Sequence, residues 1–126
     1  MITVTAVDII EYRAELASNA NALQALDMLE DCEGNLEDAA IALAISAGQE
    51  PDCSDQWLMG LAKRWRSRIC QTPSRTTLTE AETIAEQVTL LTQVIDLPVS
   101  LVTLLAIYLV KTGVDQFCAP LDETLG

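Results

Sequence analysis

The sequence predicts an all-α fold, a compact bundle of about six helices that forms a single domain over residues 1–126. Apolar residues recur every three or four positions through most of the chain, which is the spacing of a helix that buries one face. Helix-capping residues and glycines stand between these stretches. No segment alternates convincingly between apolar and polar residues over five positions, apart from the start at residues 2–5, so we expect no strands.

The first part of the chain, residues 1–48, is expected to form three helices. Thr5 followed by Asp8 is a capping-box pattern that begins the first helix, because the two side chains can satisfy free backbone N–H groups. Gly34 can adopt the left-handed conformation that ends the second helix, and Asn35 can cap the third. The expected helices span residues 5–18, 21–33 and 35–48.

The second part, residues 54–118, is expected to form three more helices. A linker with glycine and proline precedes it at residues 48–54. A second loop is expected at residues 72–77, after which Thr79 and Glu82 form a capping box for the fifth helix. The expected helices span residues 54–71, 79–95 and 98–113, followed by a short turn and an acidic, frayed C-terminus.

The sixth helix stands out because residues 97–110 carry no charge. Pro98 fits its first turn, where a missing backbone N–H costs nothing, and Gly113 can end it. A membrane span needs about twenty apolar residues, so this shorter run favours a buried core helix. A helix that binds a partner, including a second copy of the chain, is the alternative, and membrane contact is not expected.

The net charge of −12 is unevenly distributed along the chain. Residues 1–55 hold twelve acids and one base, residues 56–79 hold five bases and no acid, and residues 80–126 hold seven acids and one base. A chain this acidic repels phosphate backbones and anionic lipid up to about one Debye length, roughly 8–10 Å at physiological salt. Nucleic-acid binding is therefore not expected unless the basic segment acts alone.

The residue types present exclude several kinds of catalysis. There is no histidine, which removes serine–histidine and cysteine–histidine catalysis and most zinc chemistry. The four cysteines include no Cys-x-x-Cys pair, so neither a zinc nor an iron–sulfur site is indicated. No phosphate-binding loop and no nucleophile-elbow motif occurs. We therefore expect no enzyme activity, no catalytic residues, no metal and no cofactor.

The cysteines and the N-terminal residues also bear on cellular location. The N-terminus shows no basic stretch followed by an apolar one, so no secretory signal is visible. A cytoplasmic protein with reduced thiols is the natural interpretation, and an internal disulfide is not expected. Cys70 lies close to arginines and to apolar residues, and we expect it to be a packed thiol rather than a reactive one.

Residues 25–43 resemble the second half of a ubiquitin-associated (UBA-like) domain. That family has an Ala-Leu…Leu run, then a Gly-Asn turn, and then an alanine and a leucine on the next helix. The matching residues here are Ala25, Leu26, Leu29, Gly34, Asn35, Ala39 and Leu43. The resemblance implies a UBA-like three-helix module over residues 6–47 and a role in protein–protein contact.

Ubiquitin is not the expected partner of this module. In the family, ubiquitin binds a Met-Gly-Phe-type loop between the first two helices and a Leu-Leu-type end of the third. Here the loop reads Ser18-Asn19-Ala20, without an apolar anchor, and the helix end reads Leu43-Ala44. The resemblance therefore implies the fold and not the family's ligand.

The most unusual local feature is a basic segment with two tryptophans at residues 57–70. On a helical wheel Trp57 and Trp65 share one face with apolar residues, and four cations flank or oppose that face. These cations are Lys63, Arg64, Arg66 and Arg68. Arginine binds carboxylate or phosphate through two parallel hydrogen bonds, so the six residues form a candidate interaction patch. The alternative is that the cations only neutralise neighbouring carboxylates.

We therefore expect a non-catalytic protein–protein interaction module with an unidentified protein partner. Self-association through the apolar helix at residues 97–110 is a further option. Two alternatives stay open. One is a carboxylate- or metal-dependent enzyme, because acidic residues occur in close pairs, as at Glu37 and Asp38. Solvation of helix ends explains the same pairs. The other is a binder of nucleic acid or other anions through the segment from Lys63 to Arg75.

Overall fold

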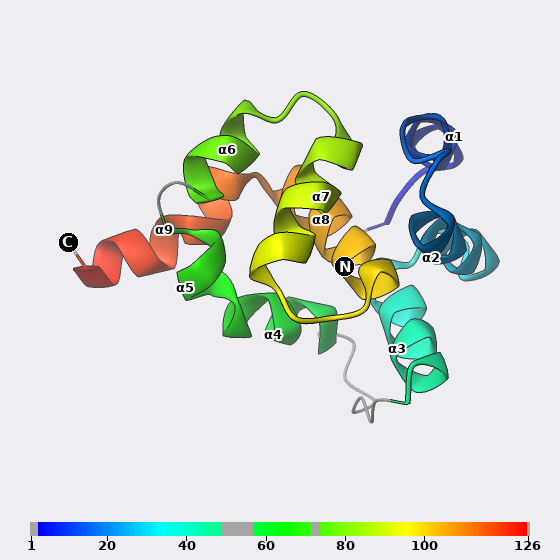
Figure 1. The fold of residues 1–126 in the computed structure, drawn as a ribbon. Coiled ribbons are helices and arrows are strands. Elements are labelled where there is room, and N and C mark those ends of the chain that lie inside the picture. The colour runs from blue at the N-terminus through cyan, green and yellow to red at the C-terminus, as the bar shows by residue number, and fades with distance from the viewer. Residues whose placement is uncertain (1–2, 49–56, 72–73, 126) are drawn as a thin grey trace.

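The structure is a computed structural model that describes residues 3–48, 57–71 and 74–125. Within these residues the chain forms nine helices and no strand, so the all-α prediction is confirmed, with more and shorter helices than expected. They are α1 (Ala6–Glu15), α2 (Ala20–Asp31), α3 (Leu36–Ser46), α4 (Trp57–Arg64), α5 (Arg66–Ile69), α6 (Ser74–Glu80), α7 (Ile84–Val94), α8 (Val99–Thr112) and α9 (Val114–Leu125). Figure 1 shows α8 in the middle of the molecule, with α1 to α3 on one side and α6 and α9 on the other.

The first three helices begin and end close to the predicted positions. The capping box at Thr5 and Asp8 forms as expected, with the backbone N–H of Asp8 donating to the Thr5 hydroxyl at 3.1 Å. Asn35 caps α3 through its side-chain oxygen, which accepts a backbone N–H of the first turn. The start of α2 differs, because Asn19, two residues before the expected start, caps the helix by accepting from the N–H of Ala22.

Gly34 lies in the turn between α2 and α3 and pairs with the extended start of the chain. Its φ of +82° lies in the left-handed region, as expected for glycine after a helix. The backbone N–H of Val4 donates to its carbonyl at 2.8 Å, and an added Cβ would clash with the Val4 carbonyl oxygen. Position 34 therefore needs glycine both for its conformation and for this close approach.

The helix predicted over residues 54–71 is divided at Trp65 into α4 and α5. Most of the expected linker and the start of this helix fall on residues 49–56, which lie outside the described residues. At Trp65 the backbone leaves helical geometry, with φ −99° and ψ 3°, and no side chain caps the next helix. After the break, Ile69 is buried in the core and Cys70 reaches α9.

Residues 74–83 differ most from the sequence-based expectation. Helix α6 forms partly inside the expected loop, and α7 begins five residues after Thr79, so the capping box predicted at Thr79 and Glu82 is wrong. The cap used is Thr83, whose hydroxyl accepts a backbone N–H of the first turn of α7 at 3.2 Å. Leu78 is buried in the core, and this tertiary packing stabilises α6 where the local sequence indicates a loop.

Helix α8 forms the centre of the core. All residues from Leu101 to Leu109 are buried, and the helix packs against α2, α3, α7 and α9. The apolar helix at residues 97–110 is therefore covered within the chain over most of its length, and Pro98 and Val110, near its two ends, are exposed. Among the described residues no single helix is long and apolar enough to cross a membrane, although α8 and α9, bent by 83°, together reach that length and composition.

The C-terminal residues form α9, so the expected frayed end is wrong for residues 114–125. The helix continues through Pro120, which lacks the backbone N–H of an interior helical residue. Phe117 and Cys118 are buried against the rest of the chain, and Arg75 of α6 forms ion pairs with two aspartates of α9. These tertiary contacts stabilise a helix that the sequence alone does not indicate.

Three acids of α1 and α3 connect the first part of the chain to the second. Glu15 accepts the backbone N–H of the first residue of α7 at 2.7 Å. Glu37 accepts two backbone N–H groups in the first turn of α4. Asp8 forms an ion pair with Lys111 at the end of α8. Since helix N-termini favour negative charge, two of these acids cap helices that are distant in the sequence.

Candidate functional site

The candidate interaction patch lies on α4 and α5, and the helical period separates its buried and exposed residues. Leu58 and Ala62 are fully buried, whereas Lys63 and Arg64 are exposed to solvent. Glu37 of α3 is itself buried and accepts N–H groups at the start of α4, at 3.1 Å in the longer of the two hydrogen bonds. The core side of α4 is thus fixed by packing and by a carboxylate, and its outer side presents cations.

Trp57 and Trp65 are half-buried and pack against the core. The tryptophans therefore anchor α4 and the break before α5, and they do not form a free aromatic face. The guanidinium of Arg68 lies 5.6 Å from the centre of the Trp65 ring, within the range of a cation–π contact. This contact orients one cation of the patch while leaving its side chain exposed.

Arg66 is oriented differently from the other cations of the patch. Its guanidinium lies 4.8 Å from the centre of the Phe117 ring on α9, and its Nε is buried without a hydrogen-bond partner among the described residues. Arg66 therefore packs against α9 and is separated from the exposed cations. The exposed cations are Lys63, Arg64 and Arg68, of which Arg64 and Arg68 line one hollow, and we call these three residues the basic surface.

The seven cations of the chain fall into two groups by their partners. Arg13 bridges two carboxylates of α2, Arg75 bridges two of α9, and Lys111 pairs with Asp8. None of the four cations on α4 and α5 forms an ion pair with a described residue. Among the described residues, local neutralisation of carboxylates therefore accounts for the first group, and no such pairing occurs at the basic surface.

A shallow hollow opens beside the basic surface, with a volume of 370 Å³. Leu97, which precedes α8, contributes to it although it is distant in the sequence. The hollow combines apolar carbons with two guanidinium groups at its edge, so it suits a small apolar side chain next to carboxylates. Its lining residues are Leu61, Arg64, Trp65, Ser67, Arg68 and Leu97.

The described residues offer little support for a metal or acid–base centre. They contain no group of three or more cysteine, aspartate or glutamate side chains that could hold a metal ion. A second cavity, of 390 Å³, lies between the ends of α6 and α8 and includes Gln87 in its lining. The Oε1 atom of Gln87 is buried without a partner among the described residues, but it is shielded from solvent and so from a ligand in the cavity.

The cysteines contradict one expectation drawn from the sequence. Cys70 and Cys118 form a disulfide, with their Cα atoms 5.8 Å apart, so the prediction that Cys70 is a reduced, packed thiol is wrong. The two residues are 48 positions apart with no local motif, and only the docking of α9 brings them together. Cys32 is free, and burial raises the pKa of its thiol. Cys53 lies outside the described residues.

Sequence reasoning found the cations of the site but missed the groups that position them. Glu37 was grouped with Asp38 as an acid pair at a helix end, and nothing in the local sequence indicates that it caps α4. Phe117 and Leu97 likewise approach the patch only through the tertiary fold. These contacts connect segments that lie 20 or more residues apart, for which helical periodicity carries no signal.

Comparison with known proteins adds no relative. The chain matches no protein-family model, no curated protein and no solved structure.

Proposed function

We propose that this chain is a non-catalytic protein–protein interaction module that binds an acidic segment of a partner protein on the basic surface. The observation that carries the proposal is the pairing of the cations. Arg13, Arg75 and Lys111 all meet carboxylates, whereas Lys63, Arg64 and Arg68 have none among the described residues. A carboxylate from a partner would supply the missing counter-charge, with bidentate hydrogen bonds at the arginines.

A short acidic peptide segment suits this surface better than a long polyanion. All nineteen acids of the chain lie outside residues 56–79, together with only two bases. A nucleic acid or an anionic membrane would extend beyond the basic surface and meet this negative charge within about one Debye length, roughly 8 Å at physiological salt. A segment of a few residues can contact the basic surface alone.

We also propose that α1 to α3 form a UBA-like module that serves as the scaffold for this surface. The support is the turn at Gly34 and Asn35 with the small residue Ala39 buried after it, in the order in which the family has them. Glu37 of the same module caps α4, and so the module positions the basic surface. The buried residues 101–109 of α8 leave no free face for self-association in this fold.

Affinity capture with charge-matched variants tests the function. The wild-type chain, the variant Arg64→Gln/Arg68→Gln and the control Gln24→Glu/Gln93→Glu are each immobilised and exposed to host extract. Both variants lower the net charge by two, and both control positions are exposed. We expect at least one protein that the wild type and the control retain and the first variant loses. Equal retention by all three, or no retained protein, would remove the proposal.

The cations of the basic surface, which form no ion pair with a described residue, also support a second candidate function, the binding of nucleic acid or another anion. A labelled single-stranded oligonucleotide, titrated at low salt, distinguishes it, because phosphate binding weakens steeply as the salt concentration rises. Tight, salt-dependent binding that Arg64→Gln/Arg68→Gln abolishes would replace the acidic protein segment by a nucleic acid as the partner. We expect no binding at physiological salt.

A further inference from the structure

The position of α5 depends on its neighbours, because the helix is too short to be stable alone. It has four residues, follows the break at Trp65 and has no side-chain cap. An isolated helix needs about 12–15 residues to be even marginally stable in water. Of its residues only Ile69 is buried, and the next residue, Cys70, carries the disulfide to α9. The disulfide is therefore a main attachment of the segment that presents Arg68.

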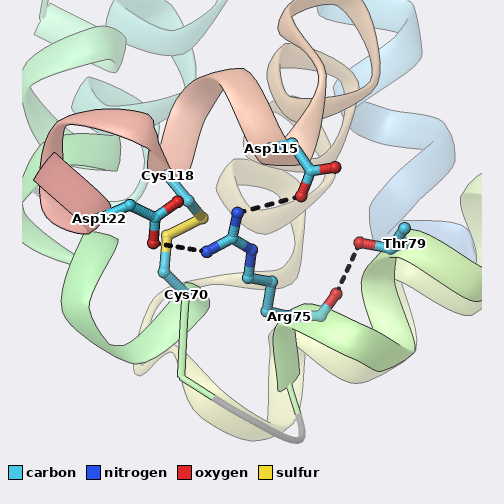
Figure 2. A network of polar contacts seen from close by, with 6 residues as sticks. All are labelled: Cys70, Arg75, Thr79, Asp115, Cys118 and Asp122. Atoms are coloured by element: carbon cyan, nitrogen blue, oxygen red, sulfur yellow. Dashed lines mark hydrogen bonds and ion pairs between the residues drawn. A yellow bond between two sulfur atoms is a disulfide. The ribbon is translucent and has the colours of Figure 1, made fainter. Parts of the chain in front are cut away.

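Helix α9 contacts α5, α6 and α8 but buries few side chains. Phe117 and Cys118 are its only buried residues among those with described side chains, and Pro120 interrupts its backbone hydrogen bonding. Figure 2 shows the disulfide beside the guanidinium of Arg75, which bonds one aspartate of α9 on either side, at 3.1 and 2.7 Å. Such ion pairs at the surface contribute little stability and are screened by salt. Those ion pairs join α9 to α6, whereas α9 and α5 are joined by the disulfide and by the contact of Phe117 with Arg66, of which only the disulfide is covalent.

We infer that the Cys70–Cys118 disulfide controls the basic surface: reduction releases α9 from α5, and the end of the surface at Arg68 loses its fixed position. Release also removes Phe117 from the guanidinium of Arg66, which then has no packing partner on α9. This inference rests on the proposed function, of which it states the regulation. The oxidised chain binds the acidic segment, and the reduced chain binds it more weakly.

The reductant is a dithiol of the kind that keeps cytoplasmic cysteines reduced. A thiolate of the reductant attacks one sulfur of the protein disulfide and forms a mixed disulfide, while the other cysteine leaves as a thiolate and takes up a proton. The second thiol of the reductant then closes its own disulfide and frees the first cysteine. Two electrons and two protons pass to the protein, and the dithiol is oxidised.

Hydrogen exchange of the full chain tests the structural step. Exchange is followed by mass spectrometry for the oxidised protein, for the protein treated with dithiothreitol, and for Cys70→Ser/Cys118→Ser, with Cys32→Ser as the control for a free cysteine. In the reduced protein and in the double variant, we expect amide protection in residues 66–70 and 114–123 to fall by about tenfold or more, while α2, α3 and α8 keep theirs. Thiol counting must show two additional thiols after treatment.

Unchanged protection of α5 and α9 after reduction would overturn the inference. So would a disulfide that dithiothreitol does not reduce in the native protein. Arg75→Gln gives a kinetic check: both cysteines are buried, so exchange with the reductant requires α9 to open, and loss of the two ion pairs should speed reduction.

Binding separates this inference from the proposed function. For a partner captured by the wild-type chain, we expect the reduced protein to bind more weakly and Cys32→Ser to bind like the wild type. Equal binding by the oxidised and the reduced chain would overturn the redox control and leave the proposed function standing. Failure of both states to bind any partner would remove the proposed function, while the exchange result would still report on α9.

Discussion

Replacement of Glu37 tests how the first part of the chain supports the basic surface. The carboxylate of Glu37 is buried and accepts the backbone N–H groups of Leu58 and Met59, at the N-terminus of α4. A hydrogen bond to a charged group contributes about 1.5–3 kcal/mol. Burial of the carboxylate costs part of that gain, so we expect Glu37→Ala to lower the free energy of unfolding by about 3 kcal/mol. In a chain of this length that loss corresponds to a melting temperature about 12 °C lower.

The assay is urea and thermal unfolding followed by circular dichroism. Glu37→Gln keeps one acceptor oxygen and the shape of the side chain, so its loss should be about half as large. Asp38→Ala is the matched control, because it removes the same charge from an exposed neighbour in the first turn of α3 and should cost less than about 1 kcal/mol. If Glu37→Ala cost no more than Asp38→Ala, the account of Glu37 as the cap of α4 would be refuted.

Three other predictions concern the turn, the core and the ion pair at the end of α8. Gly34→Ala should lower the free energy of unfolding in urea by about 2–3 kcal/mol, because its Cβ meets the Val4 carbonyl. Gly48→Ala, at a similar φ with open space around it, should cost about 1 kcal/mol. Equal losses would contradict the steric argument. Leu104→Ala should lower the free energy of unfolding by about 3 kcal/mol, since this side chain is fully buried in α8. A loss below about 1 kcal/mol would mean that α8 does not form the core. The ammonium of Lys111 lowers the pKa of the Asp8 carboxyl in the folded chain. The pair therefore stabilises the fold at a pH above the unfolded carboxyl pKa of about 3.9, and this contribution is lost as the pH falls through the lower folded pKa. In acid titration, the free energy of unfolding of Lys111→Met should depend less on pH below about pH 4 than that of the wild type.

Local signals in the sequence predicted those parts of the fold that local interactions decide. The capping box at Thr5, the cap at Asn35 and the left-handed turn at Gly34 each involve groups within a few residues of one another. The uncharged run at residues 97–110 predicted a core helix for the same kind of reason, since its composition excludes an exposed position in water.

Tertiary contacts decided the parts that the sequence did not predict. Thr79 had a complete capping-box pattern, but the chain uses Thr83, where Glu15 of α1 also reaches the first N–H of α7. Helices α6 and α9 form where the sequence indicates a loop and a frayed end, because Leu78 and Phe117 are buried in the core and the Cys70–Cys118 disulfide joins α9 to its neighbour. Propensity and caps are weak compared with such packing.

For the candidate site, the sequence identified the residues, and the structure separates the exposed cations from Arg66, which packs against α9. Lys63, Arg64 and Arg68 are exposed as their positions on a helical wheel suggest. Arg66 could not be separated from them by spacing, because its orientation depends on the aromatic ring of Phe117, which is distant in the sequence. The two tryptophans are half-buried and pack against the core.

Mapping of backbone amide chemical shifts, for the isotope-labelled chain with its captured partner, tests the role of the basic surface most directly. We predict that the changes in chemical shift on adding the partner cluster at Lys63, Arg64 and Arg68. These changes should disappear in Arg64→Gln/Arg68→Gln but persist in the charge-matched control. Shifts confined to α1 and α2, with the amides of α4 and α5 unchanged, would show that the partner docks elsewhere.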